Sequence, residues 1–460
     1  MRFLCAVKNH SFDFMSIRSR LGMFDLTMII ISLVIGVGIF KTPAIVAGKA
    51  GSPAVFYMAW IAGGIISIFG ALTFAEIGAR LPVAGGFYKI FSHCYHPAFA
   101  FMINWSQLIA LAASAAAIAL VGAEYIKPLL LPQAMQSASA TRVIALIVVV
   151  ILFLLNYAGI RMSSRAQNIL SMLKITLLFL FCMAAFGAKS PAATTAVHCT
   201  MPGAGIFKAF GLALIPVFYT YGGYQYTINF GADVKQPQRN IPYAILIGIC
   251  IIILLYMGIN IACCQALGFE NLQGKSLIAA ELAKQFFGAA GFKITSVVIF
   301  ISVVGFVNTS FMSNPRVYYA MAEDKILPPA FMRVNEKTQT QEFAITFFFA
   351  LMVLSLLFLS TFEKILNYIM FINSFSLIFG AATIFILRKR MAGSPYSGFK
   401  VRPFPVVPAL FILVLLFVCV SVSVSDPGAA IAGIALLIIG YPLYRFIRKV
   451  YSANNQAGSH

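Results

Sequence analysis

Long apolar stretches recur along this chain and restrict its fold more than any other feature. Hydrophobic residues make up 61% of the 460 residues and charged residues only 10%, which is typical of polytopic membrane proteins and not of soluble ones. A helix needs about twenty apolar residues to cross a bilayer. We identify twelve such spans, at residues 25–47, 54–79, 97–124, 141–158, 166–187, 207–231, 241–266, 291–321, 342–360, 364–387, 404–425 and 427–447. The sequence therefore predicts an all-α polytopic membrane protein with twelve transmembrane helices.

The basic residues gather in short clusters between the apolar spans. We therefore do not take the formal net charge of +20 as a sign of nucleic-acid binding. Most of the 33 Lys and Arg residues lie on one side if the N-terminus is cytoplasmic, as the positive-inside rule requires. Residues 1–24 and 448–460 are then cytoplasmic, and membrane lipids surround the spans. The segment Met1–Leu21 has no apolar core before a cleavage site, so we expect no signal peptide.

Two of the spans are interrupted by pairs of glycines. The first contains Gly36 and Gly38, and the sixth contains Gly222 and Gly223. A helix that unwinds within a membrane exposes backbone N–H groups at the positive end of its second half, and both features suit a carboxylate. Packing of the first pair against a neighbouring helix is an equally good interpretation of that pair alone. Interrupted spans in corresponding positions of two halves favour the substrate site of a transporter.

No pattern in the sequence indicates a catalytic or metal site. The histidines lack ligand spacing, the eight cysteines are scattered, and no Ser-His-Asp or Cys-His arrangement is visible. We therefore expect no cofactor, no metal site and no enzyme activity.

An ordered set of motifs covers nearly the whole chain and resembles a known family. The set consists of Ile35–Phe40, Gly51–Pro53, Gly70–Gly78, Ala84–Gly86 with Tyr88, Tyr221–Gly223, Gln236–Pro242, Val307–Asn308, Asn314–Arg316, Glu323–Asp324, Leu327–Pro328 and Pro403 with Pro405. It is similar to the amino acid–polyamine–organocation (APC) transporters, most of all to the L-type amino acid transporter branch and its prokaryotic relatives.

The resemblance implies a LeuT-like fold with two inverted five-helix repeats. These would occupy residues 25–187 and 207–387, followed by two further helices in residues 404–447. It also implies a bacterial-type inner (cytoplasmic) membrane with both termini in the cytoplasm. L-type light chains bond to a heavy chain through a cysteine after the third span. The corresponding loop, Tyr125–Thr141, has no cysteine, so we expect no disulfide-linked heavy chain.

The same resemblance places an amino acid between the two breaks. The backbone N–H groups of Val37, Gly38 and Ile39 would hold its carboxylate. The carbonyl groups of four residues would hold its ammonium: Val34, Ile35, Tyr219 and Thr220. The glycine turns would complete the site with Gly36, Tyr221, Gly222 and Gly223. Family members usually have a serine at the position of Val37 and a tryptophan at that of Tyr224, so side-chain specificity is expected to differ.

Lys174 is the charged residue that most suggests a function. It lies inside the fifth span, where a lysine is costly, although its ammonium could also reach the membrane surface along its stem. Related carriers have a lysine at this place that bridges the first and eighth helices, where sodium-coupled relatives hold a cation. Ser302 and Ser310 are candidate partners for such a coupling role. A titrating amine would give proton symport, and a permanently charged one would give sodium-independent exchange.

Other polar residues in the spans have structural interpretations. We expect Asp25 to cap the first helix and Glu76 to pair with Arg80 at a helix end. Three buried amides are expected to bond neighbouring helices, namely Asn104, Asn260 and Asn308. An ion network at the inner surface is expected from Arg316, Glu323 and Asp324.

The sequence thus predicts a secondary active transporter of amino acids that works by alternating access. Away from the helix ends, the first, third, sixth, eighth and tenth spans carry no carboxylate, so neutral amino acids are the expected substrates. We expect coupling to protons and no dependence on sodium. The alternatives are a sodium-independent exchanger and an amino acid sensor that does not transport.

Overall fold

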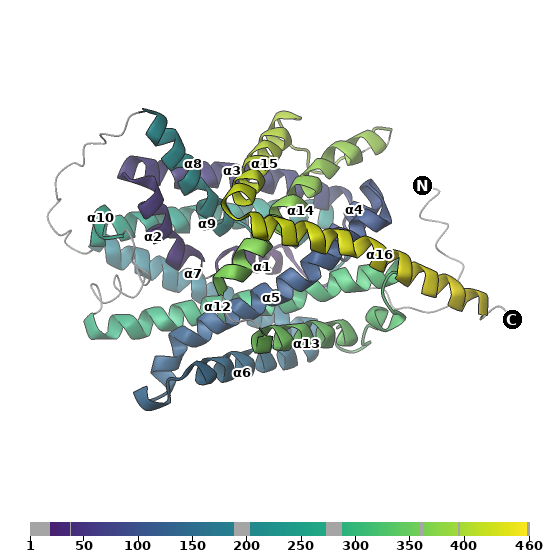
Figure 1. Ribbon diagram of the computed structural model, residues 1–460, viewed down its shortest axis with the longest axis horizontal. Coiled ribbons are helices and arrows are strands. Elements are labelled where there is room, and N and C mark those ends of the chain that lie inside the picture. Colours follow the sequence, from purple (N-terminus) through teal and green to yellow (C-terminus); the bar gives the residue numbers. More distant parts are fainter. Residues whose placement is uncertain are drawn as a thin grey trace.

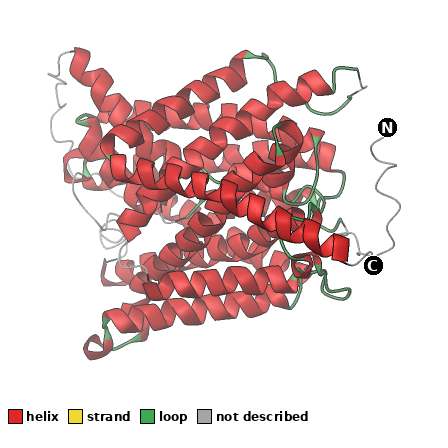
Figure 2. Ribbon diagram, turned by 45° about the vertical axis from the view of Figure 1, so that its right-hand side comes forward, coloured by secondary structure: helices red, strands yellow, loops and turns green. Residues whose placement is uncertain are grey.

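A computed structural model describes residues 19–36, 38–187, 203–272, 288–358, 362–393 and 396–457. Within these ranges nearly all of the chain is helical (Figure 2), and β structure is limited to two isolated bridges, Leu21 with Val234 and Ala84 with Phe230. The predicted all-α class is therefore confirmed for the part of the chain that is described.

The helices follow the apolar stretches of the sequence. In chain order they are α1 (Met23–Val34), α2 (Gly38–Ala50), α3 (Pro53–Arg80), α4 (Gly86–Cys94), α5 (Pro97–Leu130), η1 (Gln133–Met135), α6 (Ala138–Tyr157), α7 (Ile160–Gly187), α8 (Gly203–Thr220), η2 (Tyr224–Asn229), α9 (Pro237–Leu267), α10 (Phe269–Leu272), η3 (Gly288–Ala290), α12 (Gly291–Glu323), η4 (Pro329–Met332), α13 (Glu342–Phe358), α14 (Phe362–Arg390), α15 (Val406–Ser425) and α16 (Pro427–Ala457). Each of the twelve predicted ranges overlaps one of these helices.

Nine helices among the described residues are long and apolar enough to cross a membrane. The pair α1 and α2 makes a tenth if its two halves, bent by 44°, form one broken span. A shorter apolar helix covers Glu342–Leu357. The polytopic membrane character is thus clear, while the count of twelve crossings and the inverted repeat remain predictions.

The two halves of the chain are interleaved (Figure 1). The long helices α5 and α12 run across the centre and pack against each other. Helices α6 and α13 lie together along one edge, and α14 and α15 lie on the opposite side, while α16 packs against α5 and α14. Helix α1 packs against α9, α7 and α12, and α2 packs against α8. The two glycine breaks therefore lie in a region where elements from both halves meet.

Side-chain caps define several helix starts. Ser52 accepts a hydrogen bond from Val55 N at 3.4 Å before Pro53, and His96 Nδ1 accepts one from Ala98 N at 3.1 Å before Pro97. At the start of α1, Gly22 N–H donates to the Asp25 carboxylate at 2.9 Å. These bonds satisfy N–H groups that have no acceptor within the helix. The predicted capping role of Asp25 is confirmed.

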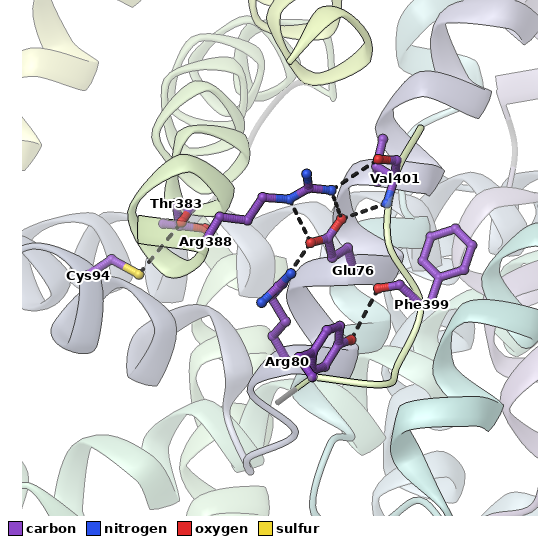
Figure 3. Close-up of polar contacts among 8 residues, drawn as sticks. Glu76, Arg80, Cys94, Thr383, Arg388, Phe399 and Val401 are labelled. Carbon is purple, nitrogen blue, oxygen red and sulfur yellow. Dashed lines mark hydrogen bonds and ion pairs between the residues drawn. The ribbon is translucent and has the colours of Figure 1, made fainter. Parts of the chain in front are cut away.

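Glu76 holds the loop between α14 and α15 against α3 (Figure 3). Its carboxylate is fully buried and accepts hydrogen bonds from Arg80 Nε at 2.6 Å, Arg388 Nη2 at 2.6 Å and Val401 N at 2.6 Å. Arg388 Nη2 also donates to Val401 O at 3.0 Å. The structural interpretation of Glu76 is therefore confirmed, with Arg388 as a further partner that sequence reasoning missed.

The predicted ion network divides into two separate groups. Buried Arg316 pairs with Asp233 at 2.6 Å, whereas Glu323 and Asp324 pair with Lys89 at 2.7 and 2.5 Å. Arg316 lies about 10 Å before Glu323 along α12, so it is buried within the protein while the two carboxylates lie at the end of the helix. The backbone N–H groups of Arg20 and Leu21 donate to Asp233 O, which connects the start of α1 to the same loop.

Candidate functional site

The first break separates α1 from α2 at residues 35–37. Ile35 N–H still donates to Ile31 O at 2.8 Å, while Gly36 N–H folds back to Val34 O at 2.9 Å. Val37 lies outside the described residues. The N–H groups of Gly38 and Ile39 begin α2 and have no acceptor within that helix. Gly38 is exposed although Ile39 and Phe40 beside it are buried, so the backbone at this helix start is accessible.

The second break lies directly against the first. Helix α8 ends at Thr220, and Tyr221, Gly222 and Gly223 form a turn before η2. Gly223 has a φ angle of +127°, and a Cβ atom on it would lie 2.4 Å from Leu33 O near the end of α1. Only glycine fits both requirements. A Cβ on Gly38 would meet the Thr220 side chain at 3.4 Å, which places the start of α2 beside the end of α8.

Tyr256 on α9 joins the two broken ends. Its hydroxyl lies 3.1 Å from Val34 O and 3.2 Å from Thr220 O, and its side chain is fully buried. Two of the carbonyl groups predicted to hold an ammonium thus already have a neighbouring donor. Each carbonyl oxygen has a second lone pair that can accept a hydrogen bond from another donor. The hydroxyl has only one proton, so it can donate to only one of the two carbonyl groups at a time. The sequence offered no signal for this contact, because Tyr256 sits in a long apolar run.

The tyrosines around the second break have different positions. The Tyr221 ring lies 5.1 Å from that of Tyr256 and 5.9 Å from that of Trp60, and it is completely buried. Because its ring is enclosed by these neighbours, it is the backbone of Tyr221 that lies near the break. Half-buried Tyr219 points toward α14, where its hydroxyl lies 2.8 Å from Ser374 Oγ. Thr220 Oγ1 lies 2.7 Å from Thr42 Oγ1, which connects α8 to α2.

Lys174 reaches the first break from α7. Its side chain is completely buried, and Nζ donates to Ile35 O at 2.6 Å and to Ser32 Oγ at 3.4 Å. A Cβ on Gly305 of α12 would lie 3.4 Å from Nζ. No ion pair among the described residues includes Lys174. The alternative in which this ammonium extends to the membrane surface is therefore wrong.

The two serines predicted as coupling residues bond within their own helix. Ser302 Oγ donates to Val298 O at 2.9 Å, and Ser310 Oγ donates to Phe306 O at 3.0 Å. A direct hydrogen bond from Lys174 to either serine is not part of this arrangement.

Comparison with known proteins now identifies the family. The family model of the amino acid permeases matches residues 21–441. The chain belongs to the amino acid permease family. The predicted relationship to the APC transporters is thus confirmed. Because this is a family of transporters, the prediction that the chain is not an enzyme is confirmed as well.

Relatives of this permease come from bacteria and mammals. It is 28% identical to the serine/threonine exchanger SteT of Bacillus subtilis over 94% of this chain and 98% of that protein. It is 26% identical to the human large neutral amino acids transporter small subunit 2 over 93% of this chain and 80% of that protein. It is also 26% identical to the branched-chain amino acid permease BcaP of Bacillus subtilis, over 96% and 95% of the two chains. The second relative supports the predicted link to the L-type branch.

A buried polar network connects the permease's Lys174 to α6 and α12. Asn308 Nδ2 donates to Gln167 Oε1 at 2.8 Å, and Gln167 Nε2 donates to Ser171 Oγ at 3.1 Å. Ser171 Oγ lies 2.9 Å from Ser32 Oγ, the hydroxyl beside Lys174. Asn156 on α6 donates to Asn308 Oδ1 at 2.8 Å. The prediction that Asn308 bonds neighbouring helices is confirmed, and the network fixes the surroundings of the amine. The Asn104 and Asn260 amides instead donate to carbonyl groups of their own helices, Ala100 O and Tyr256 O.

Proposed function

We propose that this permease is a secondary active transporter that carries neutral amino acids across the membrane by alternating access. The observation that carries the proposal is the contact between the two broken helices, with Gly223 against Leu33 O and the Tyr256 hydroxyl between Val34 O and Thr220 O. An open helix start at Gly38 supplies N–H donors, and interrupted α8 supplies carbonyl acceptors. A zwitterion matches both groups at once.

The proposed ligand set keeps the predicted residues. The N–H groups of Val37, Gly38 and Ile39 hold the carboxylate, and Gly36, Gly222 and Gly223 shape the turns. The carbonyl oxygens of Val34, Ile35, Tyr219 and Thr220 face the ammonium. The oxygens of Val34 and Thr220 also accept from the Tyr256 hydroxyl. Tyr221 contributes its backbone, because its ring packs on Tyr256 and Trp60.

Neutral substrates are favoured because the two broken helices lack carboxylates. Beyond Asp25, neither α1 and α2 nor α8 and η2 contains an Asp or Glu residue. A cationic side chain buried in this site would have no anion to offset its lost hydration. The names of the three bacterial and human relatives described above, which mention serine, threonine and neutral or branched-chain amino acids, agree with this proposal.

Lys174 is the proposed coupling residue. A buried amine without a carboxylate partner keeps its charge only against a large desolvation penalty, so it is suited to release and regain a proton during transport. Its bond to Ile35 O connects that event to the substrate site. Because the ammonium takes the place of a cation between α1 and α12, transport does not need sodium. Ser302 and Ser310 remain predicted contributors in conformations other than this one.

The proposed architecture has twelve crossings, with inverted repeats at residues 25–187 and 207–387 and two further helices at residues 404–447. The protein would reside in a bacterial-type inner membrane, with residues 1–24 and 448–460 in the cytoplasm. It would work without a disulfide-linked heavy chain, with protons, an amino acid and membrane lipids as its partners.

Exchange is the second candidate function. It is favoured by the similarity to the serine/threonine exchanger SteT. An exchanger would take up labelled amino acid only into vesicles that contain unlabelled amino acid. A sensor that binds without transporting would show no uptake under either condition.

Uptake by the purified protein in proteoliposomes separates these functions. We expect L-leucine, L-serine or L-threonine to accumulate in empty vesicles under an inward proton gradient, with or without sodium. L-arginine should not compete at equal concentration. Uptake that requires preloaded amino acid would favour exchange, and saturable arginine uptake that exceeds that of the neutral amino acids would contradict the proposed selectivity.

A further inference from the structure

Basic residues gather where α14 ends and α15 begins. Residues 388–402, which run from the last turn of α14 into the loop before α15, contain five Lys and Arg residues and no Asp or Glu. Arg80 at the end of α3 adds a further cation, because Arg80 and Arg388 both donate to the Glu76 carboxylate. The positive-inside rule explains why cations lie on one side of a membrane, but it does not require them to converge on one point.

The backbone of this loop is fixed to the same carboxylate (Figure 3). The N–H group of buried Val401 donates to Glu76 Oε2 at 2.6 Å. Lys400 and Arg402 lie on either side of Val401, and both are exposed. These two cations are therefore held beside the two arginines that bind Glu76. The loop cluster, as we call it, consists of Arg80, Arg388, Lys400 and Arg402.

Two aromatic rings order the side chains of the loop cluster. The Arg80 guanidinium lies 4.2 Å from the centre of the Tyr396 ring, and Lys400 Nζ lies 6.0 Å from the same centre. The Arg388 guanidinium lies 3.8 Å from the centre of the Phe404 ring. Cation–π contacts of this kind stabilise a cation without neutralising it, so the loop cluster keeps its positive charge in a preorganised arrangement.

The loop cluster carries more positive charge than its protein contacts neutralise. Glu76 forms ion pairs with Arg80 and Arg388, while no ion pair among the described residues includes Lys400 or Arg402. Arginine and lysine side chains are the common ligands of phosphate groups in proteins. The exposed pair of Lys400 and Arg402 therefore suits a phosphate, and the two fixed arginines behind it add to the attraction.

An apolar stripe on α15 begins next to the loop cluster. Its side chains recur every three or four residues, so they share one face of the helix, and each is 44–76% exposed. The stripe starts at Val406, four residues after Arg402. Because α15 is long and apolar enough to cross a membrane, this face meets lipid chains. The stripe consists of Val406, Leu410, Leu413, Phe417, Val420 and Val424.

We propose that the loop cluster is a binding site for an anionic phospholipid. Lys400 and Arg402 contact the phosphate of the headgroup, and the acyl chains lie along the apolar stripe of α15. The stripe favours a lipid over a soluble anion, because it continues from the cations into the membrane. The bound lipid holds the loop between α14 and α15 at the bilayer surface. This site is separate from the paired breaks and does not depend on what the protein transports.

Native mass spectrometry of the purified protein with added lipid tests this proposal. We expect the wild type to retain dioleoyl-phosphatidylglycerol under conditions in which dioleoyl-phosphatidylcholine dissociates. Lys400→Gln/Arg402→Gln should weaken phosphatidylglycerol binding about tenfold, since it removes two cations from the headgroup site. Arg161→Gln/Arg165→Gln removes the same charge from exposed positions at the start of α7 and should bind like the wild type. Both variants keep Glu76 and its arginine partners, so the fold is retained.

The deacylated headgroup, glycerophosphoglycerol, distinguishes a lipid site from a site for soluble anions. We expect an equal concentration of this headgroup to leave phosphatidylglycerol bound. Complete displacement would assign the loop cluster to soluble anions and overturn the lipid site. Equal binding of the two lipids by the wild type would also overturn it, as would undiminished binding in Lys400→Gln/Arg402→Gln. An equal loss in both double variants would mean that net charge, and not this cluster, attracts the lipid.

Discussion

Single polar atoms determine how the two breaks are held together. The Tyr256 hydroxyl lies within 3.2 Å of the last carbonyl groups of both α1 and α8, and Lys174 Nζ binds the next carbonyl, that of Ile35, from the other side. These two side chains come from α9 and α7. The carbonyl ends of both broken helices are thus fixed by residues that belong to neither helix.

The first prediction concerns the Tyr256 hydroxyl. Tyr256→Phe keeps the ring against Trp60 and Tyr221 but removes the donor to Val34 O or Thr220 O. We expect a free energy of unfolding lower by about 1 kcal/mol, measured as a lower melting temperature in detergent, and weaker amino acid binding. Tyr221→Phe is the control, since its buried hydroxyl has no partner among the described residues. Equal behaviour of the two variants would show that the bridge contributes nothing.

The second prediction concerns Lys174. Lys174→Ala removes the amine between α1 and α12, so an inward proton gradient should no longer drive accumulation of L-leucine, while binding is retained in part. Lys293→Ala is the matched control because Lys293 is exposed at the start of α12. Gradient-driven uptake that persists in Lys174→Ala would exclude this lysine from proton coupling.

At the scale of elements, the contacts between helices decide where the breaks can form. The sequence predicted two interrupted apolar spans from Gly36 and Gly38 and from Gly222 and Gly223. It could not predict that the two breaks lie against each other, since this depends on the close approach of Gly223 to Leu33 O. A residue pair 190 positions apart leaves no local pattern in a single sequence.

The third prediction concerns Gly223. Alanine at this position would be strained at a φ of +127° and would meet Leu33 O at 2.4 Å. We expect Gly223→Ala to destabilise the protein by about 2 kcal/mol or more and to reduce transport. In Gly211→Ala the nearest contact, at 3.4 Å, is an ordinary one, so that variant should remain within about 0.5 kcal/mol of the wild type. Melting temperatures that do not separate the two variants would argue against this tight contact.

The fourth prediction concerns the anchor of the loop between α14 and α15. Glu76→Gln keeps the shape of the side chain but leaves buried Arg80 and half-buried Arg388 without their anion. Loss of one member of a buried ion pair is expected to cost about 3 kcal/mol. Glu270→Gln, at an exposed position, should have no effect on the melting temperature. A Glu76→Gln protein as stable as the wild type would mean that the loop is held by other contacts.

At the scale of the whole molecule, hydropathy predicted the positions of the helices well, because a membrane demands long apolar segments and leaves few alternatives. The place of Lys174 within a span suggested a function but also allowed its ammonium to reach the membrane surface, and only the structure shows that it is buried. Its acceptor, Ile35 O, and the link through Ser32, Ser171 and Gln167 depend on the packing of α1 against α7 and α12. The bridging role of Tyr256 could not be predicted, because a tyrosine in an apolar run is usually a packing residue.

The central claim is that the open helix start at Gly38 holds the amino acid that this permease transports. The most direct test compares uptake and binding of L-leucine and L-serine by Gly38→Leu and Gly48→Leu in proteoliposomes. Both glycines lie in α2, but a Cβ on Gly48 would meet nothing within 4 Å, whereas a leucine at Gly38 would fill the approach to the N–H groups. We predict that Gly48→Leu transports like the wild type and that Gly38→Leu is folded but loses uptake. Undiminished uptake by a folded Gly38→Leu protein would contradict the account.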